Sequence, residues 1–199
     1  MSDESAIDAA VRPAVTGAEP WLGLPPALAI PPGAGAICDE AGARRIGRGA
    51  AEGAFTTAPV LVAHASLTAR RLGLAPPPRS PDLLDVLELF AFVRPARFCA
   101  PSPSGLALAL GMVEPKGAEA QAVALRHAAD ALLRELAGPA YPRREDAMTL
   151  NETLSKAGWG WGWRVSGALQ HQPMRARQYR GSGLDVWSRM TEWEDEAPR

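Results

Sequence analysis

Four side chains stand where the sequence could support metal or acid–base chemistry. His64 follows the apolar run VLVA at residues 60–63 and opens a basic stretch. Strand ends that lead into helices are where α/β proteins place functional groups, so His64 is either a remnant of a metal site or a structural residue hydrogen-bonded to a backbone carbonyl. Asp85 and Glu88 are three residues apart and share a helix face, as a carboxylate pair or as a solvated surface. Asp130, on a later helix, is the third candidate remnant of a metal site.

A second candidate site combines aromatic and basic residues. Trp159, Trp161 and Trp163 alternate with glycine, and an extended chain would place all three indoles on one face. Arginine and tyrosine residues accompany them: Arg164, Arg175, Arg177, Tyr179 and Arg180. Such a set suits stacking of single-stranded bases together with phosphate contacts. The alternative is that the tryptophans pack back on their own domain or cover a neighbouring one.

Composition limits the other possibilities. The 199 residues are 47% hydrophobic and carry a net charge of −1, so any binding of nucleic acid must come from a local patch. Cys38 and Cys99 are far apart and outside any C-x-x-C, which predicts no zinc or iron–sulfur site in this chain and a reducing compartment. The first residues lack the features of a signal peptide, and the apolar stretch 22–37 is broken by four prolines. We therefore expect a soluble, cytoplasmic protein without a membrane partner.

The elements that must position these residues are a small sheet followed by helices. Strands are expected at residues 28–30, 35–38 and 60–63, with a hairpin turn at Glu40, Ala41 and Gly42 before the run RRIGRG. Helices are expected from residue 64 to 72, 82 to 92, 104 to 111 and 118 to 137. Gly73 should stop the first helix, while Asp82 and Ser104 should cap the second and third. This order predicts an α/β fold with one mixed sheet and flanking helices.

The same pattern divides the chain into three segments. Residues 1–20 read as a flexible lead, and residues 21–140 as the folded domain. Residues 141–199 form a Trp- and Arg-rich extension, mostly irregular or helical, which holds five of the six tryptophans. Between residues 153 and 184 there are five basic residues and no acidic one, so this extension carries the predicted nucleic-acid surface.

The motifs VLVAH, DVLEL and LALALG, followed by a long helix, resemble the DEDD-type 3′ to 5′ exonucleases, which have a ribonuclease H-like fold. That family holds two divalent metals with four carboxylates. The resemblance implies D-x-E on the first strand, but residues 28–38 contain no acid. It implies an aspartate at position 69, which is Ala69, and a histidine five residues before Asp130, which is Leu125. We therefore expect a degenerate exonuclease-like domain without a metal site, with an active metal-dependent exonuclease as the alternative.

A broader resemblance runs from Leu24 onward. The run DLLDVLELFAFVRPARFCAPSPSGLALALG, the long helix, the tryptophan-rich segment and LDVWSRMTEWEDEAP resemble the N-terminal region of DinG-type ATP-dependent DNA helicases, whose motor is XPD-like and of superfamily 2. The family implies ATP, Mg²⁺ and an iron–sulfur cluster in the motor and a role in DNA repair. This chain contains no Gly-Lys pair and hence no phosphate-binding loop for ATP, so no cofactor is expected here.

The expected function is therefore that of an accessory region that lies before the helicase motor. It would position single-stranded DNA or dock on the motor, and would be inactive by itself as an ATPase. A non-catalytic protein-binding module is the remaining alternative.

Overall fold

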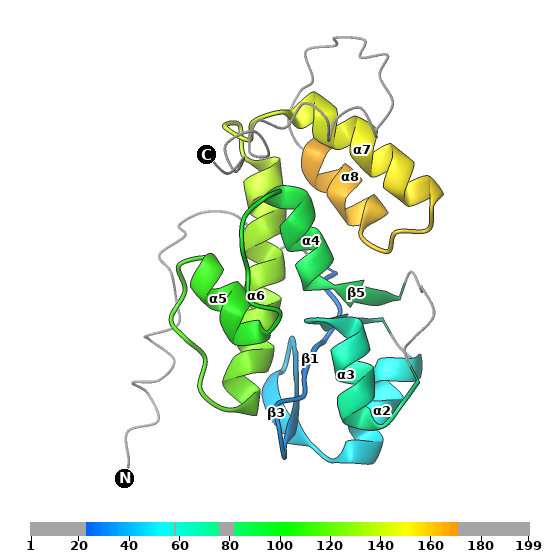
Figure 1. Ribbon diagram of the computed structural model, residues 1–199, viewed down its shortest axis with the longest axis vertical. Coiled ribbons are helices and arrows are strands. Elements are labelled where there is room, and N and C mark those ends of the chain that lie inside the picture. The colour runs from blue at the N-terminus through cyan, green and yellow to red at the C-terminus, as the bar shows by residue number, and fades with distance from the viewer. Residues whose placement is uncertain (1–22, 58, 76–81, 171–199) are drawn as a thin grey trace, which may run out of the picture.

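A five-stranded mixed sheet lies at the centre of the fold (Figure 1). The computed structural model describes residues 23–57, 59–75 and 82–170. The strands are β1 (Ala27–Ala29), β2 (Gly35–Asp39), β3 (Gly42–Ile46), β4 (Val60–Val62) and β5 (Leu83–Asp85), in the spatial order β3-β2-β1-β4-β5. β2 is antiparallel to both its neighbours, whereas β1, β4 and β5 run parallel. The predicted α/β class and the ribonuclease H-like mixed sheet are thus confirmed.

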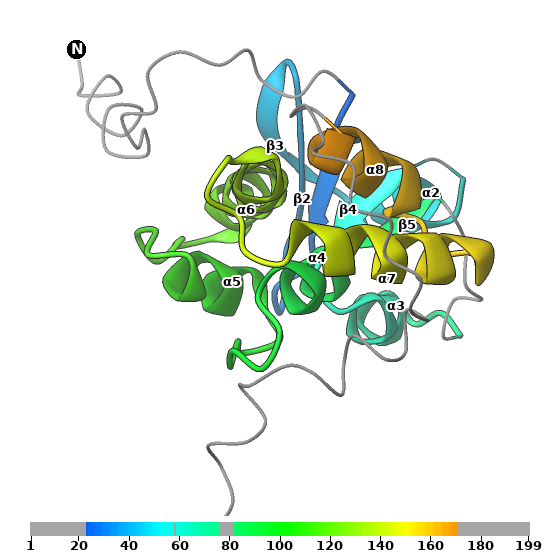
Figure 2. The ribbon, with the colours of Figure 1, turned by 90° about the horizontal axis from the view of Figure 1, so that it is seen from above.

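Helices cover both faces of this sheet (Figures 1 and 2). They are α2 (Arg48–Thr57), α3 (Ala65–Leu72), α4 (Val86–Val93), α5 (Pro103–Ala109), α6 (Ala118–Ala137), α7 (Arg144–Lys156) and α8 (Gly162–Gln170). Side chains of β4 alternate between two hydrophobic clusters, as the period of a strand requires. Leu61 belongs to the cluster formed with α4 to α8, while Val60 and Val62 pack with α2 and α3.

Several predicted elements are found where the sequence placed them. The hairpin turn lies at residues 40 and 41, where the Asp39 carboxylate accepts a hydrogen bond from the Ala41 amide at 2.9 Å. The long helix α6 has the predicted bounds. α3 ends at Gly73, whose φ of 77° is the left-handed conformation that glycine adopts without steric cost.

The segment after the proline-rich loop differs from the prediction. Residues 83–85 are strand rather than helix, and Asp85 caps α4 in place of Asp82. The run DLLDVLELF fits a helical period, but β4 offers an unpaired edge, and Leu83, Leu84 and Asp85 pair with it in parallel register. The cap of α5 is likewise Ser102, not Ser104, because Pro103 occupies the first helical position, where its missing N–H costs nothing.

The two helices after the expected boundary at residue 140 contribute to the main core. Ala147 and Leu150 of α7 and Val165 and Leu169 of α8 share one cluster with α6. Within the described residues this extension is therefore helical and packed against the sheet domain. None of the helices in the described ranges is long and apolar enough to cross a membrane.

Candidate functional site

His64 occupies the turn that joins β4 to α3. Its φ of 61° lies in the left-handed region, and its Nδ1 accepts a hydrogen bond from the Leu67 amide at 3.2 Å. The ring thus caps α3 through an acceptor nitrogen. The structural interpretation of His64 fits this geometry, although the bond seen is one that the ring accepts from a helix amide, because the free amides of a first helical turn need acceptors.

Asp85 joins the same turn to the start of α4. Its carboxylate accepts hydrogen bonds from the amides of His64 at 3.0 Å and Ala65 at 2.7 Å, and also from Leu87 at 3.0 Å. One side chain therefore caps α4 and holds the end of β4 against it. Three backbone donors occupy both oxygens, which leaves this carboxylate poorly suited to metal binding or proton transfer.

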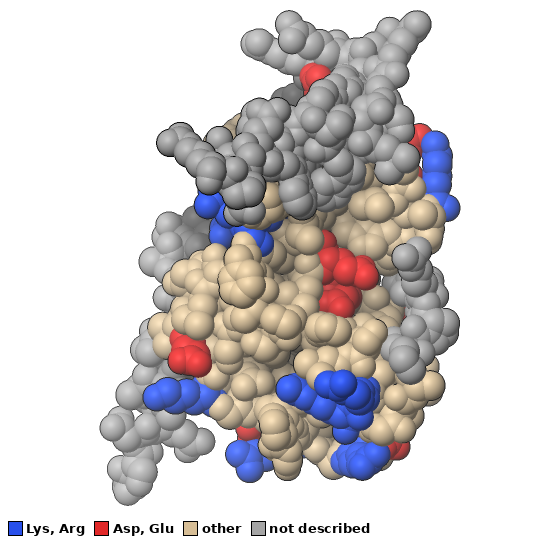
Figure 3. All heavy atoms as spheres, in the orientation of Figure 1, with Lys and Arg blue, Asp and Glu red and all other residues tan. Residues whose placement is uncertain are grey.

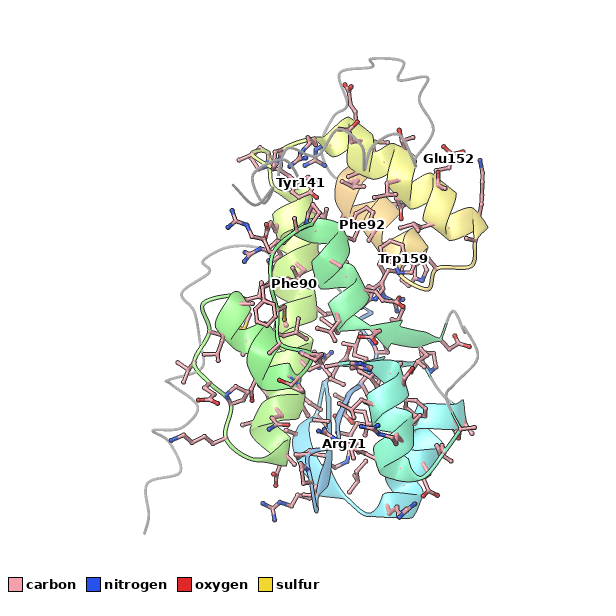
Figure 4. All side chains as sticks on the ribbon, in the orientation of Figure 1. Arg71, Phe90, Phe92, Tyr141, Glu152 and Trp159 are labelled. Carbon is pink, nitrogen blue, oxygen red and sulfur yellow. The ribbon has the colours of Figure 1, made fainter. Side chains whose placement is uncertain are left out.

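Glu88 is engaged by the tryptophan-rich segment. Its Oε2 accepts a hydrogen bond from Trp159 Nε1 at 3.0 Å, and the Trp159 ring lies 5.0 Å from that of Phe92 between centroids (Figure 4). Figure 3 shows acidic side chains near the middle of the face of the molecule that is turned toward the viewer. The two carboxylates of the Asp85–Glu88 pair thus bind different partners, so they do not form an acid–base pair.

The positions that resemble exonuclease metal ligands hold apolar side chains in the interior. The first strand, β1, where D-x-E is implied, holds only Ala27, Leu28 and Ala29, and these residues, Ala69 on α3 and Leu125 on α6 are each at most 1% exposed. Asp130 pairs with Arg134, one turn later on α6, with Oδ2 and Nε 2.6 Å apart. Two Mg²⁺ ions need several oxygen ligands converging on one place, and this donor set does not fit them. The described part of the chain contains no group of three or more His, Cys, Asp or Glu side chains that could hold a metal.

The three alternating tryptophans do not share a face. Residues 162–170 are helical, so the segment WGWGWR does not adopt the extended conformation that would place all three indoles on one face. Trp161 is fully buried, and its Nε1 donates to the Asp85 carbonyl at 2.8 Å. Trp159 is partly buried, whereas Trp163 is 65% exposed. The large apolar area of an indole favours burial when an acceptor is within reach of its N–H, and the Glu88 carboxylate and the Asp85 carbonyl supply that acceptor for Trp159 and Trp161.

Trp163 is the accessible indole of this segment, and the half-buried Arg164 lies beside it. The Arg164 guanidinium lies 4.1 Å from the centroid of the Trp163 ring, and its Nη2 donates to the Gly23 carbonyl at 3.1 Å. Partial burial lowers the pKa of Arg164 from its usual value. The other predicted contacts, Arg175, Arg177, Tyr179 and Arg180, lie outside the described residues.

The structure also forms a pocket that the sequence did not reveal. It has a volume of about 570 Å³ and lies among α4, the C-terminal half of α6 and the start of α7, and we call it the α4–α7 pocket. Arg94 and Glu135 line it as a pair, with Nη2 and Oε2 2.9 Å apart. Burial raises the pKa of Tyr141, another lining residue, to about 12, and its hydroxyl donates to the Val93 carbonyl at 3.3 Å. These residues come from segments about 40 positions apart, so no local motif marks the pocket.

Exposed apolar side chains gather along the chain around α5. Phe98 is 89% exposed, Leu108 57% and Val113 74%. Phe98 also lines the α4–α7 pocket.

Comparison with known proteins adds no relative. No family model matches the sequence, and neither a curated protein nor a solved structure matches it.

Proposed function

We propose that this chain is a non-catalytic accessory region of a DinG-type ATP-dependent DNA helicase and that it docks on the helicase motor. One observation carries the non-catalytic part: the first strand, β1, holds no acid, and positions 69 and 125 hold Ala and Leu, and all of these residues are at most 1% exposed. A carboxylate or imidazole at these positions would have to displace core packing. The strand order supports descent from an exonuclease-like fold whose catalytic groups have been replaced.

Docking is supported by the apolar surface around α5. Leu108 and Val113 are large, exposed and only five positions apart in sequence. Contiguous exposed apolar patches mark protein-contact surfaces, and we infer that Leu108 and Val113 belong to one such patch. A motor domain linked to this chain is the partner that the helicase resemblance implies.

Single-stranded DNA is a second candidate ligand, supported by the Trp163–Arg164 pair. An exposed indole beside a guanidinium could stack a base and contact its phosphate. The buried Trp161 and the Glu88-bound Trp159 weaken this alternative, because they remove two of the three expected stacking surfaces.

The docking proposal is tested by measuring the affinity of this chain for a purified DinG-type motor with titration calorimetry. Leu108→Asp is expected to weaken binding at least tenfold, since it places a charge in an apolar interface, whereas Trp163→Ala should leave it unchanged. If the wild-type chain does not bind the motor but binds single-stranded DNA, with an affinity that falls with salt and is lost in Trp163→Ala, the DNA alternative replaces docking.

The exonuclease alternative has its own test. The purified chain, incubated with Mg²⁺ or Mn²⁺ and labelled single-stranded DNA, is expected to release no nucleotides. Asp130→Asn is the appropriate variant because the half-buried Asp130 pairs with Arg134 on its own helix, whereas Asp85→Ala would remove hydrogen bonds that join two elements of the fold. Metal-dependent release that Asp130→Asn abolishes would refute the non-catalytic proposal.

A further inference from the structure

The α4–α7 pocket has an aromatic and apolar interior. Phe92, Val93 and Leu150 line it and are at most 5% exposed, and the ring of Tyr141 adds a further aromatic surface (Figure 4). A volume of about 570 Å³ is within the range of pockets that bind small ligands or a large side chain. The interior therefore suits an aromatic group.

The rim of the pocket carries a small excess of positive charge, because Arg94, Arg97 and Arg143 line it together with Glu135 and Asp146. Arg94 is already neutralised, because its guanidinium makes hydrogen bonds to both oxygens of Glu135. Arg97 lines the same pocket and is exposed, and within the described ranges its guanidinium pairs with no acidic group. The adjacent Phe98 is 89% exposed. An aromatic side chain flanked by carboxylates would complement both features, because it would bury the apolar wall and place negative charge beside Arg97.

We propose that the α4–α7 pocket binds a segment of this same chain, residues 191–196 with the sequence TEWEDE. Trp193 enters the pocket, and Glu192 and Glu194 lie toward Arg97. Trp187 is a poorer occupant, because its neighbours are Val186 and Ser188 and neither carries a charge. The proposal does not rest on the helicase function, since it depends only on the pocket and this segment.

The end of α8, from which this segment continues, lies near the pocket. Arg144 binds the Leu169 carbonyl through Nη1 at 2.6 Å, and through Nη2 it binds the carbonyls of Leu136 at 2.9 Å and Gly138 at 2.7 Å. These bonds hold the end of α8 against the α6–α7 junction. Arg144 is also the neighbour in sequence of Arg143, which lines the pocket.

Only 22 residues separate Gln170 from Trp193. A flexible linker of that length has a root-mean-square span of about 25 Å. It gives an effective concentration of about 1 mM for a tethered ligand.

A fluorescent peptide of residues 186–199, titrated by anisotropy into the full chain, tests the proposal. The tethered segment should compete with the peptide, so the wild-type chain should bind it at least tenfold more weakly than the Trp193→Ala chain does. Trp187→Ala is the matched control and should behave as wild type. Arg97→Glu in the Trp193→Ala chain should abolish binding. A peptide carrying Glu192→Arg and Glu194→Arg should then restore it. Arg97 is exposed, and thermal unfolding should confirm that Arg97→Glu leaves the fold intact.

Three results would overturn the proposal. The first is that the peptide binds neither the wild-type nor the Trp193→Ala chain. The second is that Trp187→Ala and Trp193→Ala raise its affinity equally. The third is a molar mass by light scattering that shows a wild-type dimer dissociated by Trp193→Ala, which would place the segment in the pocket of a second copy.

Discussion

Replacement of Asp85 by alanine tests whether its carboxylate is structural or is the remnant of a catalytic site. The carboxylate accepts three backbone hydrogen bonds, two from the turn after β4 and one from the first turn of α4. A hydrogen bond to a charged group contributes about 1.5–3 kcal/mol. Loss of an N-cap side chain costs about 0.5–2 kcal/mol. Because the site is only half-buried, water can replace part of the lost hydrogen bonding. We therefore expect Asp85→Ala to lower the free energy of unfolding by about 3–5 kcal/mol.

The assay is urea denaturation followed by circular dichroism, with thermal unfolding as a second measurement. The melting temperature should fall by about 6–20 °C, given a shift of about 2–4 °C per kcal/mol for a chain of this size. Asp85→Asn should have an intermediate effect, because its amide keeps one acceptor but turns an NH₂ group toward a backbone donor. Asp130→Ala is the matched control and should cost about 0.5–1 kcal/mol, since it removes one partly buried ion pair between residues one helical turn apart.

The reasoning about Asp85 would be refuted by a stability of Asp85→Ala within about 1 kcal/mol of the wild type, which is less than a single charge-assisted hydrogen bond is expected to contribute. Equal effects of Asp85→Ala and Asp130→Ala would also contradict it. Either result would reopen the possibility that Asp85 is retained for chemistry.

Three further predictions follow from burial. Trp161→Ala should lower stability by about 3–5 kcal/mol in urea denaturation, because it empties a fully buried site; Trp163→Ala should stay within about 0.5 kcal/mol of the wild type. Ala69→Asp should be destabilising by at least about 3 kcal/mol and should not produce nuclease activity, because it buries a carboxylate at a site with no exposure. The absorbance of ionised tyrosine should show that Tyr141 titrates near 12, a step absent from Tyr141→Phe. Because this pKa is raised by folding, its contribution to stability is complete below about pH 10 and is lost as the pH rises through 12; a melting temperature that rises over this interval would contradict it.

Local sequence patterns were sufficient for elements that carry their own boundary signals. α6 has twenty residues of helical spacing between Gly117 and Gly138, and α3 ends at a glycine in the left-handed conformation. The hairpin between β2 and β3 is marked by a polar turn with Gly42 at φ 114°. In each case the decisive interaction lies within a few residues, so the sequence alone could predict it.

β5 could not be predicted this way. Three residues cannot display a strand period, and the surrounding LLDVLELF fits a helix as well. The edge of β4 makes these residues a strand rather than a helix, because Leu83–Asp85 pair with it in parallel before the chain enters α4.

The candidate sites likewise have some features that the sequence determines and others that depend on the tertiary structure. The sequence by itself determined that positions 69 and 125 carry no metal ligand and that Trp159, Trp161 and Trp163 are concentrated in one segment. Only the tertiary structure decided that Trp161 is buried with its N–H on the Asp85 carbonyl, 76 positions away, and that Arg94, Glu135 and Tyr141 line one pocket. Residue identity fixes which chemistry is possible, whereas accessibility and partners depend on contacts between distant segments, which no local pattern records.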